Sequence, residues 1–382
     1  MAFKGVATLD VGSSKIIATV AERGVNDTFS VKGQALRYYE GFAEGQFLDE
    51  QSLEWAISDA IAEVVKATGV SIGEIYVSVP GVFIRLENKK YKLSLGKQRK
   101  ITKNDVQSLF EEGKVRVKTD GYEVIGYSEV FFALDDNRKV ENPVGVVSSM
   151  LGGAITYYLC ENYFLQTVRK ILLKHKIKDV KFVFIGQAEG NYLLSKEERE
   201  TPSLLLDVGY ITSEMTIHLG NGVLAECSED FGGGILTYHM VKEFDLEVFE
   251  GEVLKREINF ALNPSSKSSY TIEVDDNTLD FSSERVNEIA FSTVDAFLGS
   301  VSEFLESNTP PSMENIKVYL TGGGLSYLRG IKSHVSARLG TSVEIITPKV
   351  PYGTKPDFSS VYSLLDYALT DKEKHKKRFF GF

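Results

Sequence analysis

Apolar runs alternate with polar, glycine-containing turns along this chain, and one such pattern occurs twice. The first copy is LDVGSSK at residues 9–15, and the second is LDVGYITSE at residues 206–214. The β-prone runs that flank the two copies are residues 5–9, 16–20, 203–206 and 215–219. Each copy therefore predicts a β-hairpin whose first strand ends in a carboxylate, Asp10 or Asp207.

Helical spacing of apolar positions predicts the longer helices. We expect them over residues 51–68, 161–176, 284–305, 328–339 and 358–369. Trp55 lies near the apolar face of the first of these helices. We expect its side chain in the core, because large apolar side chains are mostly buried. Residues 196–201 are expected to form a charged linker between two halves of the chain.

The stretch from about residue 82 to residue 160 is richer in strands. Short β-prone runs lie at residues 91–95, 122–127 and 154–159, and Thr102 to Asp105 forms a capping-box pattern that opens a helix. This texture predicts a small α+β domain inserted into the first half. The 382 residues, 43% of them hydrophobic, suffice for two or more domains with their own cores.

Composition narrows the class of function. The net charge of −10 argues against nucleic acid as a main partner, because binding it depends on cationic contacts to phosphate. Two cysteines give no disulfide framework, which fits a reducing compartment. The chain runs from Met1 directly into the first strand pattern, and its apolar runs fall short of the ~20 residues that span a bilayer. We therefore expect a soluble cytoplasmic protein.

The repeated turns suit phosphate chemistry. Glycine lets the backbone approach a ligand closely, and adjacent amides form a concavity that binds anions. Asp10 and Asp207 would hold a hydrated Mg²⁺ that bridges the phosphates. With the further turns FGGGILT at residues 231–237 and LTGGGL at residues 320–325, the pattern predicts a duplicated fold that binds a nucleotide between its halves. Taken alone, the turn at residues 231–237 fits an anion site and a plain tight turn equally well.

The order of these motifs resembles that of the actin, Hsp70 and sugar-kinase superfamily. Four further segments resemble the bacterial cell-division FtsA family: IYVSVPG at 75–81, NPVG at 142–145, VYLTGGG at 318–324 and PDF at 356–358. An insertion after residue 82 is typical of the FtsA and PilM branch. The resemblance implies an α/β, duplicated actin-like (ribonuclease H-like) fold with an inserted α+β subdomain.

That resemblance also implies a division of the chain. It places the first actin-like half (IA) at residues 1–82 and 161–195, the SHS2-like insertion (1C) at 83–160, the second half (IIA) at 196–226 and 316–370, subdomain IIB at 227–315, and a basic, aromatic tail at 371–382.

The family's nucleotide-binding positions transfer residue by residue. The implied ATP and Mg²⁺ ligands are Asp10, Gly12, Ser13, Ser14, Lys15, Asp207, Gly209, Thr212, Ser213, Gly232, Gly233, Glu252, Lys255, Gly322, Gly323 and Gly324. Asp10 and Asp207 would act on Mg²⁺ through water and count as the catalytic carboxylates. Without the resemblance, Glu252 and Lys255 at i,i+3 would more often be a surface ion pair.

Two positions depart from the family in ways that affect turnover and phosphate binding. Gln187 stands where the family has an acid; it can orient a water but cannot take its proton, so we expect binding with weak hydrolysis. Glu189 lies one or two residues out of register. Tyr210 and Ile211 replace glycines of the second loop, and large side chains there either crowd the phosphates or point outward.

The resemblance further implies filament formation by stacking of protomers, and binding of the FtsZ C-terminal tail. The implied partner-binding positions are Arg285, Val286, Ile289 and Thr293. The tail would bind an anionic membrane through Lys376, Lys377, Arg378, Phe379, Phe380 and Phe382. The other interpretation of the tail is a solvated basic end. The alternatives for the whole chain are a PilM-like or pseudo-ATPase scaffold and, less favoured, a small-molecule kinase.

Overall fold

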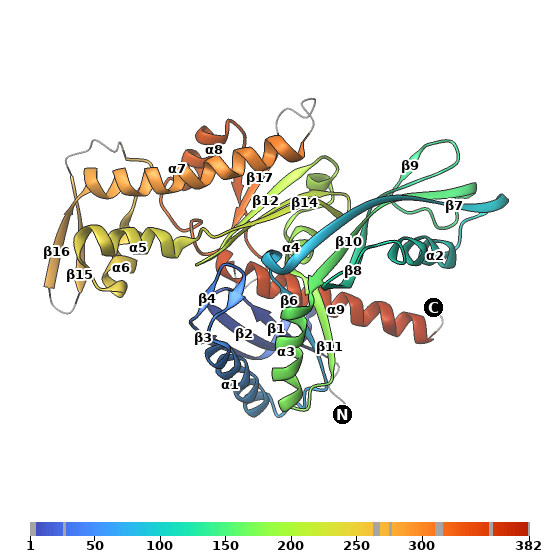
Figure 1. Cartoon of the computed structure of the whole chain (residues 1–382), viewed down its shortest axis with the longest axis horizontal. Coiled ribbons are helices and arrows are strands. Elements are labelled where there is room, and N and C mark those ends of the chain that lie inside the picture. Colours follow the sequence, from blue (N-terminus) through green and yellow to red (C-terminus); the bar gives the residue numbers. More distant parts are fainter. Residues whose placement is uncertain are drawn as a thin grey trace. The chain divides into compact units, whose positions relative to one another are not determined.

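The computed structural model describes residues 5–25, 28–262, 268–274, 277–309, 316–350 and 354–380, with side chains up to residue 374 in the last range. These residues divide into two compact units (Figure 1). Unit 1 comprises Met1–Pro202, Thr216–Glu226 and Ser360–Phe382, and unit 2 comprises Ser203–Met215 and Cys227–Ser359.

A five-stranded sheet forms the core of unit 1. Its strand order is β11-β6-β1-β2-β3, with β1 antiparallel to β2 and parallel to β6. The runs β1 and β6 are buried along nearly their whole length, as expected for strands covered on both faces. The strands are β1 (Val6–Val11), β2 (Lys15–Arg23), β3 (Phe29–Tyr38), β6 (Glu74–Val79) and β11 (Asp179–Phe184), and a short hairpin adds β4 (Phe42–Ala43) and β5 (Gln46–Phe47).

The first two predicted helices are confirmed as α1 (Glu50–Thr68) and α3 (Asn162–Lys174). Helix α1 begins after Asp49, whose carboxylate accepts a 2.9 Å hydrogen bond from the Ser52 amide. It packs against β2, β3 and α3. The expectation for Trp55 is wrong, because its side chain is 57% exposed. Trp55 lies two residues after the buried Leu53, which turns it away from the face that covers the sheet.

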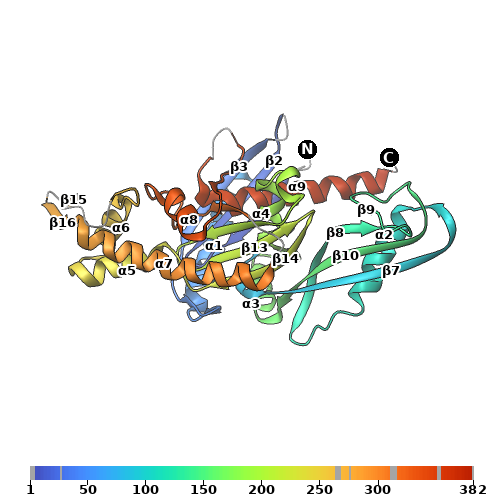
Figure 2. The ribbon, with the colours of Figure 1, turned by 90° about the horizontal axis from the view of Figure 1, so that it is seen from above.

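The insertion forms a sheet of its own within unit 1. Its order is β7-β10-β8-β9, and α2 packs against β7 and β10 (Figures 1 and 2). The elements are β7 (Ile84–Lys100), α2 (Lys103–Lys114), β8 (Tyr122–Ala133), β9 (Lys139–Val140) and β10 (Val147–Glu161). The Thr102–Asp105 capping box is present. The strands are much longer than expected. β7 contains several lysines, which make its sequence resemble a polar segment, and yet it pairs with β10 from Ile84 to Lys100.

A second five-stranded sheet has the order β14-β13-β12-β17-β18. Its strands are β12 (Ser203–Val208), β13 (Ser213–Leu219), β14 (Gly222–Glu229), β17 (Lys317–Thr321) and β18 (Val343–Ile345). In unit 2 the helices α5, α6 and α7 pack with the hairpin β15–β16 (Figures 1 and 2). These elements are α5 (Gly233–Phe244), α6 (Val248–Glu257), β15 (Ser269–Val274), β16 (Asn277–Ser282) and α7 (Ser283–Asn308).

The two sheets share one topology, which confirms the predicted duplication. In each, a central strand (β1 or β12) lies beside its hairpin partner (β2 or β13) on one side and beside a strand parallel to it (β6 or β17) on the other. The outer strands are β3 or β14 and β11 or β18. In both sheets, therefore, the LDVG segment ends the central strand.

Two helix boundaries and one loop differ from expectation. Helix α8 (Ile331–Leu339) begins three residues later than predicted, because Gly330 is left-handed with φ 75° and interrupts the helix. Helix α9 (Ser359–Phe380) continues well beyond residue 369. Residues 196–201 are not a plain linker: they hold a 3₁₀ turn (Glu197–Arg199) whose buried Arg199 donates to Asn191 Oδ1 at 2.9 Å. The remaining short elements are α4 (Ile185–Leu193) and the 3₁₀ turns Gly81–Phe83 and Pro356–Phe358.

A buried histidine in unit 1 makes stability depend on pH. Burial, helped by the charge of Arg199, lowers the pKa of His218 from 6.5 to about 3. Between these values the unfolded chain binds a proton that the folded chain does not, so stability falls as the pH drops below 6.5. We expect a loss of roughly 2 kcal/mol in unfolding free energy between pH 6.5 and 4.5.

Urea unfolding at both pH values, on the wild type and on His218→Gln, measures this effect. The glutamine can still hydrogen-bond Thr216, which lies 2.8 Å from His218 Nε2, but it does not titrate. The variant should lose less stability over this interval than the wild type does. Equal losses in the two proteins would assign the pH dependence to other groups.

Candidate functional site

The two LDVG turns close with the same backbone hydrogen bond. The Gly12 amide donates to the Lys15 carbonyl at 3.0 Å, and the Gly209 amide donates to the Thr212 carbonyl at 3.0 Å. A Cβ on Gly209 would lie 2.7 Å from that carbonyl oxygen, so the turn requires glycine. The middle residues of the turns are Ser13-Ser14 and Tyr210-Ile211. Main-chain amides of the middle residues in turns of this kind can bind an anion.

Asp10 is a buried carboxylate beside the first turn, with 4% of its surface exposed. Burial raises its pKa, and hydrogen bonds from Ser360 and Ser78 and the charge of Lys15 oppose that shift. The Ser360 hydroxyl donates to Asp10 Oδ2 at 2.8 Å, and Ser78 Oγ accepts from the Val11 amide at 2.7 Å. A cation would stabilise the ionised form of this carboxylate, so its surroundings fit a Mg²⁺ bound through water.

Three glycine motifs meet in unit 2 around the second turn. The Gly233 amide donates to the Gly209 carbonyl at 3.0 Å, and the Gly324 amide donates to the Val208 carbonyl at 2.7 Å. Gly322 has φ +83°, and a Cβ there would lie 2.1 Å from Asp207 Oδ1. The structure thus brings the second LDVG turn, the start of α5 and the LTGGG turn together at Asp207.

Gly324 is a position in this junction where an added side chain would clash with the main chain. A Cβ there would lie 2.3 Å from the Gly209 carbonyl oxygen. We expect Gly324→Ala to lower the unfolding free energy by about 1–3 kcal/mol, as overpacking does. Gly299→Ala is the matched control: a Cβ at that position in α7 meets nothing within 4 Å, and alanine should add up to about 1 kcal/mol of stability. Urea unfolding measures both, and a Gly324→Ala protein as stable as the wild type would contradict this packing.

Glu252 and Lys255 are not a surface ion pair. The Lys255 side chain is 6% exposed, and its Nζ lies 2.7 Å from Glu252 Oε2. The Thr237 hydroxyl donates to the same oxygen at 2.7 Å, and Lys255 Nζ donates to the Gly233 carbonyl at 3.4 Å. Burial lowers the pKa of Lys255, and Glu252 opposes that shift. The pair is therefore built into the first turn of α5, beside the glycine junction.

Ser213 and Gln187 have surroundings that bear on their predicted roles. Ser213 is fully buried, and its hydroxyl donates to the Phe231 carbonyl at 2.7 Å, so it fixes the approach to α5. Gln187 is half-buried on α4 in unit 1, and Glu189 on the same helix is 1% exposed. Both Asp10 and Gln187 thus belong to unit 1, whereas Asp207, Glu252 and Lys255 belong to unit 2.

The predicted partner-binding residues lie on α7 with different exposures. Val286 is fully buried, whereas Ile289 and Thr293 are half-buried. Arg285 is exposed, and its guanidinium forms ion pairs with Glu243 at 2.6 Å and Glu288 at 2.7 Å, which raise its pKa. On this helix, therefore, Val286 belongs to the core, and the other three positions reach the surface.

The predicted membrane residues fall at the end of the described chain. The backbone is helical through Phe380, but the side chains of Lys376, Lys377, Arg378, Phe379 and Phe380 lie outside the described residues, as does Phe382 altogether. No helix within the described ranges is long and apolar enough to span a bilayer.

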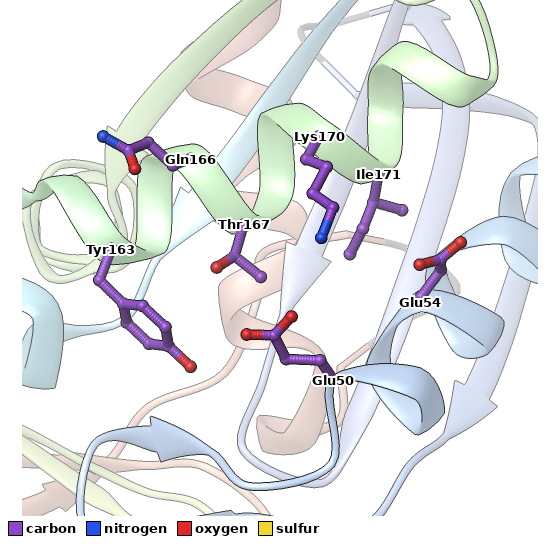
Figure 3. A pocket seen from close by; sticks show the side chains of 7 residues that line it. All are labelled: Glu50, Glu54, Tyr163, Gln166, Thr167, Lys170 and Ile171. Carbon is purple, nitrogen blue, oxygen red and sulfur yellow. The ribbon is translucent and has the colours of Figure 1, made fainter.

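A cavity of about 220 Å³ that the sequence did not indicate lies between α1 and α3. Figure 3 shows Glu50, Glu54 and Lys170 directed into it, with Tyr163 at one end. Its remaining lining residues are Gln166, Thr167 and Ile171. Two carboxylates against one lysine disfavour an anionic ligand, so this cavity does not compete with the glycine junction as a phosphate site.

Comparisons with known proteins agree with this architecture. Residues 81–158 match the family model "SHS2 domain inserted in FTSA", and residues 163–359, just over half of the chain, match "Type IV pilus assembly protein PilM". Among curated proteins, cell division protein FtsA of Escherichia coli (strain K12) is 21% identical over 97% of this chain and 91% of its own length. FtsA of Buchnera aphidicola subsp. Baizongia pistaciae is 20% identical over 84% of this chain and 77% of its own length.

Solved structures show the same fold at low identity. The PilM–PilN type IV pilus biogenesis complex matches with a TM-score of 0.63 and 15% identity, covering 95% of this chain and 98% of that chain. MreB5 of Spiroplasma citri, bound to ADP, matches with a TM-score of 0.57 and 12% identity over 97% and 98% of the two chains.

The paired sheets and these structural neighbours define the class: the chain is a protein with the duplicated, actin-like fold of the superfamily that the sequence indicated. Within that class, the two family models and the FtsA relatives place it in a narrower group. It belongs to the FtsA and PilM branch, as an FtsA-like member that has diverged to 20–21% identity from those curated relatives.

Proposed function

We propose that the protein binds ATP with Mg²⁺ through the two LDVG turns, the glycine junction and the Glu252–Lys255 pair. The observation that carries this proposal is the convergence of the α5 start and the LTGGG turn on residues 207–209 of the second LDVG turn, at distances that leave no room for side chains on the glycines. Two MreB5 structures of the same fold hold ADP and AMPPNP, which supports a nucleotide as the ligand. Mg²⁺ would supply charge neutralisation at the phosphates, with Asp10 and Asp207 holding its waters.

We infer that hydrolysis is weak. A general base must take a proton from the attacking water, and the amide of Gln187 can only orient that water. Glu189 is almost completely buried. The protein therefore uses nucleotide as a ligand that sets its conformation and assembly, more than as a substrate to be consumed.

The FtsA relatives and the SHS2 match support a role in cell division. We propose that protomers stack into filaments, bind the FtsZ C-terminal tail and tether the FtsZ ring to the inner face of the membrane at the division site. Arg285, Ile289 and Thr293 on α7 are the proposed surface contacts for FtsZ. The C-terminal tail is the proposed membrane contact.

The PilM match supports the second candidate, a PilM-like scaffold. Equilibrium titration with ATP, with and without Mg²⁺, tests the nucleotide site that both candidates share. Titration with an FtsZ tail peptide and, separately, with PilN distinguishes them. Binding of the FtsZ peptide supports the division role, and binding of PilN in its place assigns the chain to pilus assembly.

A further inference from the structure

Tyr210 occupies an unusual place in the glycine junction. Its carbonyl accepts a 2.8 Å hydrogen bond from the Gly234 amide, and its ring lies against the same residue. A Cβ on Gly234 would lie 3.1 Å from Tyr210 Cε1 and 3.2 Å from Tyr210 Cζ. The missing side chain at Gly234 therefore makes the space that the tyrosine ring fills on the first turn of α5.

The ring also reaches the pair that the family assigns to the nucleoside. Lys255 Nζ lies 5.7 Å from the ring centroid, and Thr237 lies close enough to the phenol to oppose the burial that raises the pKa of Tyr210. Thr237 is the residue that also donates to Glu252. Tyr210 thus contacts Gly234, Thr237 and Lys255, all of which border the proposed nucleoside site.

We propose that the Tyr210 side chain fills part of the nucleoside site when no nucleotide is bound, and that it must rotate away before an adenine nucleotide can bind. This inference rests on the proposed function and deepens it. The sequence left open whether this side chain crowds the phosphates or points outward; in the structure the ring folds back over the first turn of α5.

The surroundings of the ring allow such a motion. Tyr210 remains 40% exposed, so solvent can receive the ring without any change in the core. Its carbonyl is held by the Gly234 amide, which does not restrict rotation about χ1. Rotation would uncover Thr237 and the Glu252–Lys255 pair for the ligand.

A side chain that occupies the site lowers the apparent affinity by the fraction of molecules in which the site is open. If the ring is displaced in roughly one molecule in ten or fewer, removing it should raise the affinity for ATP at least about tenfold. Tyr210→Phe keeps the ring but loses the hydroxyl near Thr237, so its affinity should fall between those of the wild type and Tyr210→Ala.

The test is calorimetric titration of the full-length wild type, Tyr210→Ala, Tyr210→Phe and Tyr238→Ala with Mg²⁺–ATP. Tyr238 is the matched control, because it is also a tyrosine of α5, is 57% exposed, and its ring lies beside His239 and Lys242. Thermal unfolding of each variant without nucleotide confirms that it is folded.

The result that supports the proposal is tighter binding by Tyr210→Ala and unchanged binding by Tyr238→Ala. If the wild type binds ATP measurably and Tyr210→Ala binds it equally well, the blocking role of the Tyr210 ring is overturned, and the proposed nucleotide site remains supported. Weaker binding by Tyr210→Ala would also overturn the blocking role, because the ring would then be a platform that contacts the bound nucleoside. If neither the wild type nor any folded variant binds ATP, both the proposed function and the blocking role of the Tyr210 ring are overturned.

Discussion

Replacing Asp10 or Asp207 by asparagine is expected to abolish most of the gain in ATP affinity that Mg²⁺ provides. A carboxylate that holds a metal-bound water contributes charge as well as a hydrogen bond, and asparagine keeps only the hydrogen bond. We expect each variant to lose about 10–100-fold in Mg²⁺-dependent ATP affinity, the range found when residues in the outer shell of a metal are replaced. Titration with ATP in the presence of Mg²⁺ and of EDTA measures it.

The stability of each variant without Mg²⁺ shows whether it has lost a metal contact or has failed to fold. Burial raises the pKa of Asp10, so its neutral isostere should not destabilise the protein without Mg²⁺, and Ser360 can still donate to the amide oxygen. Asp120→Asn, at an exposed position of unit 1, is the control and should bind as the wild type does. If Asp10→Asn and Asp207→Asn both retained the full Mg²⁺ effect, the site would be assigned to the wrong residues.

The central elements of the fold could be predicted because their signals are local. Each LDVG segment combines a buried strand, a carboxylate and a glycine turn within about ten residues. The matching strand orders of the two sheets follow from repeating that unit. Local patterns did not predict the length of a strand where that length depends on pairing with a strand distant in the sequence. The lysines of β7 conceal a 17-residue strand, since only its partner β10 shows that it continues.

Single side chains were harder to place than elements. Trp55 lies one position off the buried stripe of α1, and hydrophobicity alone cannot reveal an offset of that size. Residues 196–201 are charged, but Arg199 is buried because backbone carbonyls and Asn191 satisfy its guanidinium. A charged residue in a sequence is therefore expected at the surface only when no polar groups of the fold satisfy its hydrogen bonds in the interior.

In the candidate site, too, some features could be predicted from the sequence and others could not. The sequence predicts the glycine motifs, because glycine is favoured where a Cβ would clash with a neighbouring main chain or where φ is positive. It does not predict that Ser213 is engaged with Phe231, or that Tyr210 turns towards α5, because both depend on contacts between separate elements. The cavity between α1 and α3 is lined by residues of two helices far apart in the chain, so no single motif marks it.

The C-terminal helix suggests how the tail would be presented to a membrane. The two acidic residues of the tail are held within unit 1: Asp371 Oδ2 lies 3.3 Å from Lys181 Nζ, and Glu373 Oε1 lies 3.4 Å from Arg23 Nε. Residues 371–382 contain five Lys or Arg against these two acids. Each of these two cations also pairs with a second carboxylate of unit 1, Glu74 at 3.2 Å from Lys181 and Asp366 at 2.9 Å from Arg23. The positive charge of the tail therefore follows from its composition, with three more cations than acids.

Removing residues 376–382 is therefore expected to abolish co-sedimentation of the protein with anionic liposomes. Burial of a phenylalanine is worth roughly 1.5–3 kcal/mol, and each cation near an anionic leaflet adds about 1 kcal/mol. One copy should bind weakly after the cost of ordering is subtracted, and filaments should bind much more tightly through avidity. The truncated chain should unfold at the same temperature as the full chain, because the contacts of Asp371 and Glu373 are retained.

Two matched variants separate the contributions of charge and of apolar burial. Replacing Lys376, Lys377 and Arg378 by glutamine should remove the preference for anionic over neutral liposomes. Replacing Phe379, Phe380 and Phe382 by serine should leave weak pelleting that disappears at high salt, since screening removes the remaining attraction. Because the truncation removes every aromatic residue of the tail and three of its cations, unchanged pelleting of the truncated chain would refute the anchor and leave the solvated basic end as the better interpretation.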